Sequence, residues 1–305
     1  SDKEVNIKIA LGGPWRDGRM TLEQRNELLA SFTEDVAEAC LRNNYQQSLA
    51  ISLAELRSAE RLGYAGRLMR DLEQRGLLDR DLEELPSDDG LAVLQSNGQG
   101  LTRPEIAVLL RWSKIALAQD LLASDVPDQP ANETFVEQYF PEKLRRDFLD
   151  DLRNHRLRRD IIVTRISNDM INRGGPTMLI RLQDATGRSS ADIAAGFIAV
   201  LDIYGLPNLW SQIDALDNLV AGEDQLRRYL RTQSFLIEQI IRLLRREAGR
   251  DFSAVVKEEA SKAGELSSLM GTCLSEAQQA RLEEATDALA GNGVPRELAG
   301  KVAQL

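Results

Sequence analysis

The segment from Leu101 to Leu122 carries the strongest local signal in the chain for one kind of secondary structure. Thr102 is a suitable N-cap, and Glu105, three residues later, completes a capping box that satisfies free N–H groups at a helix start. Pro104 falls in the first turn, where its missing N–H has no helical partner to lose. Apolar residues then recur at helical spacing: Ile106, Leu109, Leu110, Ile115 and Leu122. The segment is therefore predicted to be a helix with one buried face.

Helical spacing of apolar residues continues through most of the chain, whereas the alternation typical of strands is nearly absent. Two four-residue series predict two helices separated by a turn at Asn43-Asn44; they are Leu28, Phe32, Val36, Cys40 and Tyr45, Leu49, Leu53, Leu56. Residues 5–9 alternate, but Ser1 and Glu4 form a second capping box, which favours a helix there. We predict an all-α, multi-helical fold in which amphipathic helices are joined by short turns.

Glycine, proline and capping residues predict where other helices begin and end. Gly76 is expected to end a third helix that starts at Tyr64, and residues 79–100 are expected to form an irregular connector. Breaks or caps are further expected at Val126–Pro130, Pro141, Gly174-Gly175-Pro176, Ser189 with Asp192, and Gly205-Leu206-Pro207. A faint likeness between residues 148–162 and 285–299 fits either a repeated helix pair or chance similarity of amphipathic helices.

Length, composition and charge exclude several classes of protein. A chain of 305 residues with 43% apolar residues is long enough for one large or two ordinary domains with a sizeable core. The net charge of −10 argues against nucleic-acid binding and against anionic membranes. No secretory signal is visible, and no apolar run reaches the roughly 20 residues of a membrane helix. Cys40 and Cys273 are expected to be free thiols in a reducing compartment, so cytoplasm is the predicted location.

Catalytic and metal-binding patterns are missing from the sequence. His155 is the single histidine, which leaves no His-centred metal cluster, and Asp151 four residues before it predicts a local ion pair rather than a catalytic dyad. The glycine pairs lack a preceding buried strand, so none makes a dinucleotide fingerprint. We predict no catalytic, cofactor-binding or metal-binding residue in this chain.

Two arginine-rich stretches and three tryptophans are candidate binding features of the sequence. The arginines of residues 145–165 are interleaved with aspartates, which favours a solvated, salt-bridged surface over an anion or effector site. The arginines of residues 227–250 fall on a long amphipathic pattern and are expected on its polar outer face. Trp15, Trp112 and Trp210 are expected to be core or interface anchors.

Several segments resemble one family in wording and in order. They are SDKEVNIKI at the start, RNELLASFTEDVAEACLRNNYQQSLAISL from Arg25, TRPEIAVLL and KIAL from Thr102, RRDIIVTRISNDMINRGGPTMLIRL from Arg158, and RGLLDR, QYFP and YGLPNLWSQIDALDN. Over nearly its whole length the chain resembles the C-terminal region of the large bacterial NAD-specific glutamate dehydrogenases. The resemblance implies a parent enzyme that converts L-glutamate, NAD and water into 2-oxoglutarate, ammonia and NADH. It also implies that NAD binds outside this chain.

The resemblance further suggests one substrate contact and a division of the chain. In the wider family a Ser-x-x-Glu motif follows the nucleotide domain, and its serine contacts the substrate side-chain carboxylate; Ser1 and Glu4 look like its counterpart. In the isolated chain we expect Ser1 to serve only as an N-cap. Residues 1–20 are interpreted as the exit of the catalytic core, 21–250 as the main helical domain, and 251–305 as a further helical segment truncated at its C-terminal end.

The predicted role of the region is structural, oligomerising or regulatory, and the isolated chain is predicted to be inactive. Its expected partners are the catalytic core of the same polypeptide and further copies of the parent in a homo-oligomer. The alternative is a stand-alone helical interaction scaffold without a catalytic parent. An RNA-binding helical module is disfavoured by the acidic charge.

Overall fold

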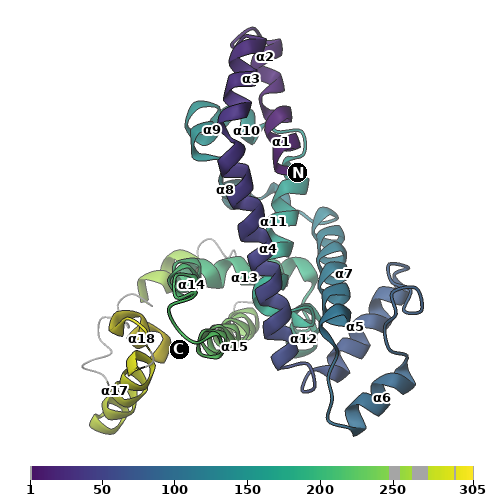
Figure 1. The fold of residues 1–305 in the computed structure, drawn as a ribbon, viewed down its shortest axis with the longest axis vertical. Coiled ribbons are helices and arrows are strands. Elements are labelled where there is room, and N and C mark those ends of the chain that lie inside the picture. Colours follow the sequence, from purple (N-terminus) through teal and green to yellow (C-terminus); the bar gives the residue numbers. More distant parts are fainter. Residues whose placement is uncertain (1, 247–254, 263–273, 292, 305) are drawn as a thin grey trace. The chain divides into compact units, whose positions relative to one another are not determined.

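The computed structural model describes residues 2–246, 255–262, 274–291 and 293–304, and every regular element in these ranges is a helix (Figure 1). The all-α prediction is therefore confirmed. The chain divides into two compact units, Ser1–Thr177 and Met178–Leu305, which are described separately below. The boundaries expected near residues 20 and 250 stay predictions about the parent protein.

The first unit contains eleven α-helices and two short 3-10 turns among its described residues. The α-helices are α1 (Asp2–Ala10), α2 (Gly12–Arg16), α3 (Leu22–Ser31), α4 (Thr33–Leu56), α5 (Leu62–Gln74), α6 (Asp88–Ser96), α7 (Arg103–Leu122), α8 (Glu133–Tyr139), α9 (Glu142–Asp147), α10 (Leu149–Arg153) and α11 (Arg158–Gly174). The 3-10 turns are η1 (Val126–Asp128) and η2 (Pro130–Asn132), and they form the break expected at Val126–Pro130.

Helices α7 and α11 form the centre of this unit. They run antiparallel, because Ser113 Oγ donates to the Pro176 carbonyl at 3.1 Å while Arg159 Nη2 donates to the Leu122 carbonyl at 3.0 Å. Their facing side chains are fully buried and include Leu109, Leu117, Ile162 and Met170. The second half of α4 packs on both helices through Ala50 and Leu53, which completes a three-helix core.

The helix predicted from Leu101 to Leu122 is confirmed as α7, with one change in its buried face. The Glu105 carboxylate accepts the Thr102 N–H at 2.6 Å, which is one of the two bonds of a capping box, and it also accepts the Thr102 hydroxyl at 2.7 Å. Leu122, expected on the apolar stripe, is 36% exposed, and the stripe ends on Leu117 and Leu121 instead. An α-helix has 3.6 residues per turn, so residues four apart drift slowly around the helix axis. Over five turns this drift moves the buried row by one position, from Leu122 to Leu121.

The turn expected at Asn43-Asn44 is wrong, because α4 continues unbroken through both residues. Two exposed asparagines lower helix propensity by only a few tenths of a kcal/mol each, which flanking packing easily overcomes. The break lies eleven residues earlier, at Phe32, which caps the end of α3 and the start of α4. Phe32 is buried, so the apolar series is interrupted at a core contact rather than at a polar turn.

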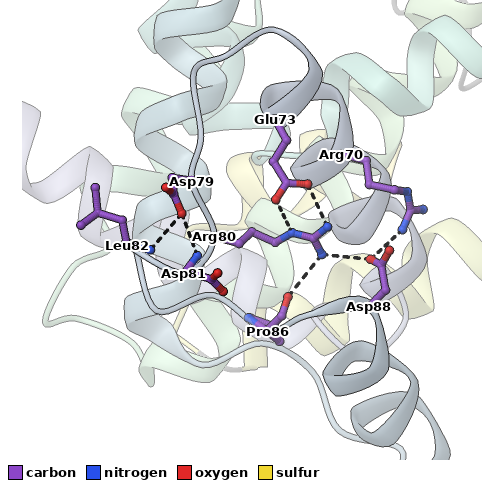
Figure 2. A network of polar contacts seen from close by, with 8 residues as sticks. All are labelled: Arg70, Glu73, Asp79, Arg80, Asp81, Leu82, Pro86 and Asp88. Atoms are coloured by element: carbon purple, nitrogen blue, oxygen red, sulfur yellow. Dashed lines mark hydrogen bonds and ion pairs between the residues drawn. The ribbon is translucent and has the colours of Figure 1, made fainter.

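The irregular connector expected at residues 79–100 is also partly wrong, because it contains helix α6. Ser87 caps this helix by accepting the Gly90 N–H at 3.2 Å. Figure 2 shows that the loop before α6 is held by Arg80, which bonds Glu73 of α5 at 2.7 and 2.8 Å and Asp88 of α6 at 2.9 Å. Local ion pairs therefore order this segment. A polar composition alone does not distinguish such an ordered segment from a solvated loop.

The second unit is built on α13 and α15. Its described helices are α12 (Met178–Thr186), α13 (Ser190–Tyr204), α14 (Leu206–Asp214), α15 (Gly222–Arg246), α17 (Glu276–Gly291) and α18 (Arg296–Ala303), and residues 255–262 are also helical. The expected caps are confirmed: Ser189 Oγ accepts the Asp192 N–H at 3.1 Å, and Gly205 takes a left-handed φ of 60° between α13 and α14. Helices α17 and α18 pack closely on each other.

Three helices of the described ranges, α4, α7 and α15, are long enough to compare with a membrane span, at 24, 20 and 25 residues. No single helix there combines the length and apolarity needed to cross a membrane. Helices α13 and α14 pass together by length and composition alone, with a bend of 72° between them.

Candidate functional site

The one residue predicted to contact substrate stands just before helix α1. Ser1 lies outside the described residues. What the structure shows of this site is the set of contacts that hold α1 in place. Glu4, the motif glutamate, is exposed, and its carboxylate accepts a hydrogen bond from Lys8 Nζ at 2.5 Å. This hydrogen bond lowers the pKa of Glu4 below its ordinary value. Glu4 is thus an ionised surface group in this chain.

Tyr139, the last residue of α8, makes three contacts with α1. Lys3 Nζ donates to the Tyr139 carbonyl at 3.2 Å and lies 3.9 Å from the centre of the Tyr139 ring. Asn6 Nδ2 donates to the Tyr139 hydroxyl at 3.0 Å. Burial, with a smaller repulsion from Arg165, lowers the pKa of Lys3 to about 8. The first two turns of α1 are therefore held by one residue that lies 133 to 136 residues further along the chain.

His155 also holds the second turn of α1 through a hydrogen bond. Its Nδ1 accepts the Leu157 N–H at 3.1 Å, so Nε2 must carry the proton of the neutral ring and donate it to the Asn6 carbonyl, also at 3.1 Å. Burial lowers the pKa of His155, which keeps the ring neutral at pH 7. The single histidine of the chain therefore holds α1 in place through its hydrogen bond to Asn6.

The ion pair expected between Asp151 and His155 is wrong. Helix α10 ends at Arg153, so the two residues are not four apart on one helix. Asp151 instead accepts two hydrogen bonds from Arg19, at 2.6 and 2.9 Å. This contact ties the segment after α2 to α10.

A second group of charges lies half-buried between α7 and α11. Burial lowers the pKa of Lys114 to about 8 and raises the pKa of Asp169. Arg165 Nη2 lies 3.8 Å from Asp169 Oδ2, at the long end of ion-pair distances. Lys114 and Asp169 therefore lie in a poorly solvated part of the first unit.

The part of the chain that the structure describes holds neither a cluster of metal ligands nor a dinucleotide-binding fold. No group of three or more His, Cys, Asp or Glu side chains there could hold a metal ion. The described elements include no strand, so they contain no strand, glycine turn and helix that could bind a dinucleotide. Cys40 is a half-buried free thiol, and Cys273 lies outside the described residues.

The tryptophans divide into three environments. Trp210 is 5% exposed, and its Nε1 donates to Thr232 Oγ1 at 3.2 Å, as expected of a core anchor. Trp112 is half-buried, with Nε1 donating to Glu83 Oε1 at 3.0 Å. Trp15 is 45% exposed, so it is not a core anchor of this chain.

Sequence reasoning missed Tyr139, Asn6 and Lys3. Each pair spans more than 130 residues, so no local spacing could have joined them. The one available signal was QYFP, which resembles the family and contains Tyr139 and Pro141.

Comparisons with known proteins assign both ends of the chain to one kind of enzyme. A family described as "Glutamate dehydrogenase, C-terminal" matches residues 98–305, and "Bacterial NAD-glutamate dehydrogenase, catalytic domain" matches residues 1–54. Proteins named NAD-specific glutamate dehydrogenase are similar throughout: 39% identical over 303 residues in Halomonas elongata, 42% over 316 in Pseudomonas aeruginosa and 30% over 304 in Mycobacterium tuberculosis.

Each of these alignments covers 99% of this chain but only 18 to 19% of the relative. The chain thus spans about a fifth of the length of the curated relatives it matches. The C-terminal family model by itself covers more than half of the chain. This chain therefore belongs to the glutamate dehydrogenase C-terminal family.

Proposed function

We propose that this chain is the C-terminal helical region of an NAD-specific glutamate dehydrogenase and acts in it as a positioning element. The parent reaction is L-glutamate, NAD and water to 2-oxoglutarate, ammonia and NADH. One observation carries the proposal: α1 lies in the segment that matches the catalytic-domain model, whereas Tyr139 and His155, which hold it, lie in the segment that matches the C-terminal model.

Hydride transfer needs a bound nicotinamide and a positioned substrate. The rest of the parent supplies NAD binding and the catalytic groups in this proposal, and the present chain supplies the support of α1. Ser1 directly precedes α1 in the sequence and, by family resemblance, its hydroxyl donates to the substrate side-chain carboxylate. A shift of α1 would move that hydroxyl, so Tyr139 and His155 are positioning residues rather than catalytic ones.

The experiment compares steady-state kinetics of the full-length enzyme with those of Tyr139→Phe. This variant removes the hydroxyl that accepts from Asn6 and leaves the ring and the carbonyl that contact Lys3. Loss of one such bond is worth about 0.5–1.5 kcal/mol, so we expect KM for glutamate to rise about 2- to 10-fold. KM for NAD should stay unchanged, because α1 is not a nucleotide-binding element.

Tyr64→Phe is the matched control, since Tyr64 lies on α5 and is 36% exposed. It should leave both KM values unchanged. The proposal fails if Tyr139→Phe has the same KM for glutamate as the parent, or if it alters KM for NAD to the same extent.

We also propose that the parent assembles as a homo-oligomer in the cytoplasm. The support is the family resemblance and the number of exposed large apolar side chains on this chain, among them Trp15, Leu22, Leu56 and Val93. Deleting the region from the full-length enzyme and measuring its mass in solution tests this. A deletion variant that keeps the native mass would contradict it.

A further inference from the structure

Helix α3 and the first part of α4 are largely without buried residues. No residue of α3 is buried, and the first buried residues of α4 are Ala50 and Leu53, beyond its seventeenth position. These two contact the core formed with α7 and α11. The preceding four turns of α4 therefore lack a packing partner on at least one side.

One row of this exposed stretch carries no charge. Ala37, Leu41, Asn44 and Ser48 follow at intervals of four, three and four residues, so they share one face of the helix, and all are exposed. We call this row the α4 outer face. Leu41 is its largest member and is 69% exposed. The positions on one side of the row hold charges, Glu34, Glu38 and Arg42, whereas those on the other side, Cys40 and Gln47, are uncharged.

The match to the catalytic-domain model points to what covers this row. The model ends at residue 54, inside α4, and the match to the C-terminal model begins only at residue 98. The α4 outer face thus lies in catalytic-domain sequence, while the helix is anchored through its other end to the C-terminal core. About four-fifths of each relative lies outside the part that this chain matches.

We propose that the α4 outer face is the docking surface for the catalytic-domain polypeptide that precedes residue 1 in the parent enzyme. This inference rests on the proposed function. Small side chains at positions 37, 44 and 48 let another element approach closely, and Leu41 provides the apolar contact at the centre of the row. Helix α4 then bridges the two regions, with one half packed on each.

The test measures how fast a small maleimide labels a thiol placed at position 41 in the full-length enzyme. Leu41→Cys is made in a Cys40→Ser background, because the native thiol lies in the same peptide. Leu82→Cys and Leu219→Cys are the controls, since these leucines are 80% and 72% exposed on this chain and lie outside the catalytic-domain match. Peptide mass spectrometry gives each labelling rate, native and in urea.

Docking predicts that native structure slows labelling of Leu41→Cys at least about 10-fold relative to urea, as burial of a side chain does. The controls should be slowed less than Leu41→Cys. A smaller effect at position 41, in an enzyme that still forms NADH from glutamate, overturns the inference. So does protection that disappears when the enzyme is diluted to monomers, because the occupant would then be a second copy of the chain.

Hydroxyl-radical footprinting of the unaltered enzyme keeps the test independent of whether the cysteine variants fold. Leu41 should be oxidised more slowly than Leu82 and Leu219 relative to the same peptides in urea, and equal rates would overturn the inference. Failure of the proposed function is a different result. It would appear as a full-length protein that forms no NADH from glutamate, whatever the labelling at position 41.

Discussion

Two arginine-rich stretches of similar composition do different work in this chain. In residues 145–165 the arginines pair with carboxylates at the surface, as in Arg153 Nη2 to Glu137 Oε1 at 2.8 Å and Arg158 Nη2 to Glu133 Oε1 at 3.5 Å. In α15, by contrast, Arg228 is 2% exposed and forms no ion pair with any described residue.

The arginines of α15 bond to the ends of other helices. Arg228 Nη2 donates to the Leu289 carbonyl of α17 at 3.5 Å, Arg231 Nη2 to Ala303 of α18 at 2.8 Å, and Arg245 to Ala185 of α12 at 2.8 and 3.3 Å. All three acceptors belong to a last turn, where carbonyls lack intrahelical partners and the helix dipole is negative. The first stretch is therefore mainly an ion-paired surface, with Arg159, which donates to the Leu122 carbonyl, as the exception, whereas three arginines of the second stretch join α15 to its neighbours.

The largest expected effect is at Arg228. Arg228→Ala leaves a cavity in place of a fully buried side chain and should lower the free energy of unfolding of the second unit by about 2–4 kcal/mol. Arg228→Met fills most of that volume and removes a charge whose burial is costly, so it should lie within about 1 kcal/mol of the parent. Urea unfolding followed by hydrogen exchange of α15 measures both.

The difference between the two variants is the decisive result. If both lose equal stability, the guanidinium contributes more than its volume, and the bond to Leu289 must be far stronger than its 3.5 Å suggests. If neither loses stability, Arg228 is not buried as the structure has it.

The burial of Arg228 could have been predicted from helix geometry. It occupies the same four-residue row as Thr232, Leu236, Ile240 and Leu244, all of which are buried. The expectation that the arginines of residues 227–250 share a polar outer face rests on their charge and not on their position, and it is wrong for Arg228. Arg227 and Arg242, at 73% and 66% side-chain exposure, do lie on that face.

The partners of the first stretch were beyond sequence reasoning. The interleaved aspartates were the expected partners, and of these only Asp147 pairs within the stretch, with Arg146 at 2.7 Å. Glu133 and Glu137 come from α8, which precedes the stretch and packs against α10 and α11. Caps and turns were predicted well because their hydrogen bonds span three or four residues, whereas the contacts of His155 and Tyr139 with α1 span more than 130.

A smaller effect is expected at Arg231. Arg231→Met keeps the apolar stem and loses the bond to the Ala303 carbonyl, which should destabilise α18 by about 1 kcal/mol. Faster hydrogen exchange of the α18 amides, with unchanged exchange in α13, is the expected signature. Arg227→Met is the matched control, because Arg227 pairs with Glu223 and Asp224 of its own helix. Equal exchange of α18 in the two variants would show that Arg231 does not hold that helix.

The smallest effect is expected where the arginines meet solvent. Glu133→Gln removes the charge facing both Arg153 Nε at 3.9 Å and Arg158 Nη2 at 3.5 Å, yet should change the free energy of unfolding by less than about 1 kcal/mol. Since ions screen exposed pairs, what difference there is should shrink further at about 1 M salt, where the Debye length is about 3 Å. The bond from Arg231 to a helix-end carbonyl should respond less to salt, because it does not depend on two opposite charges. A salt-independent loss above about 2 kcal/mol in Glu133→Gln would make the first stretch as structural as the second and remove the distinction between them.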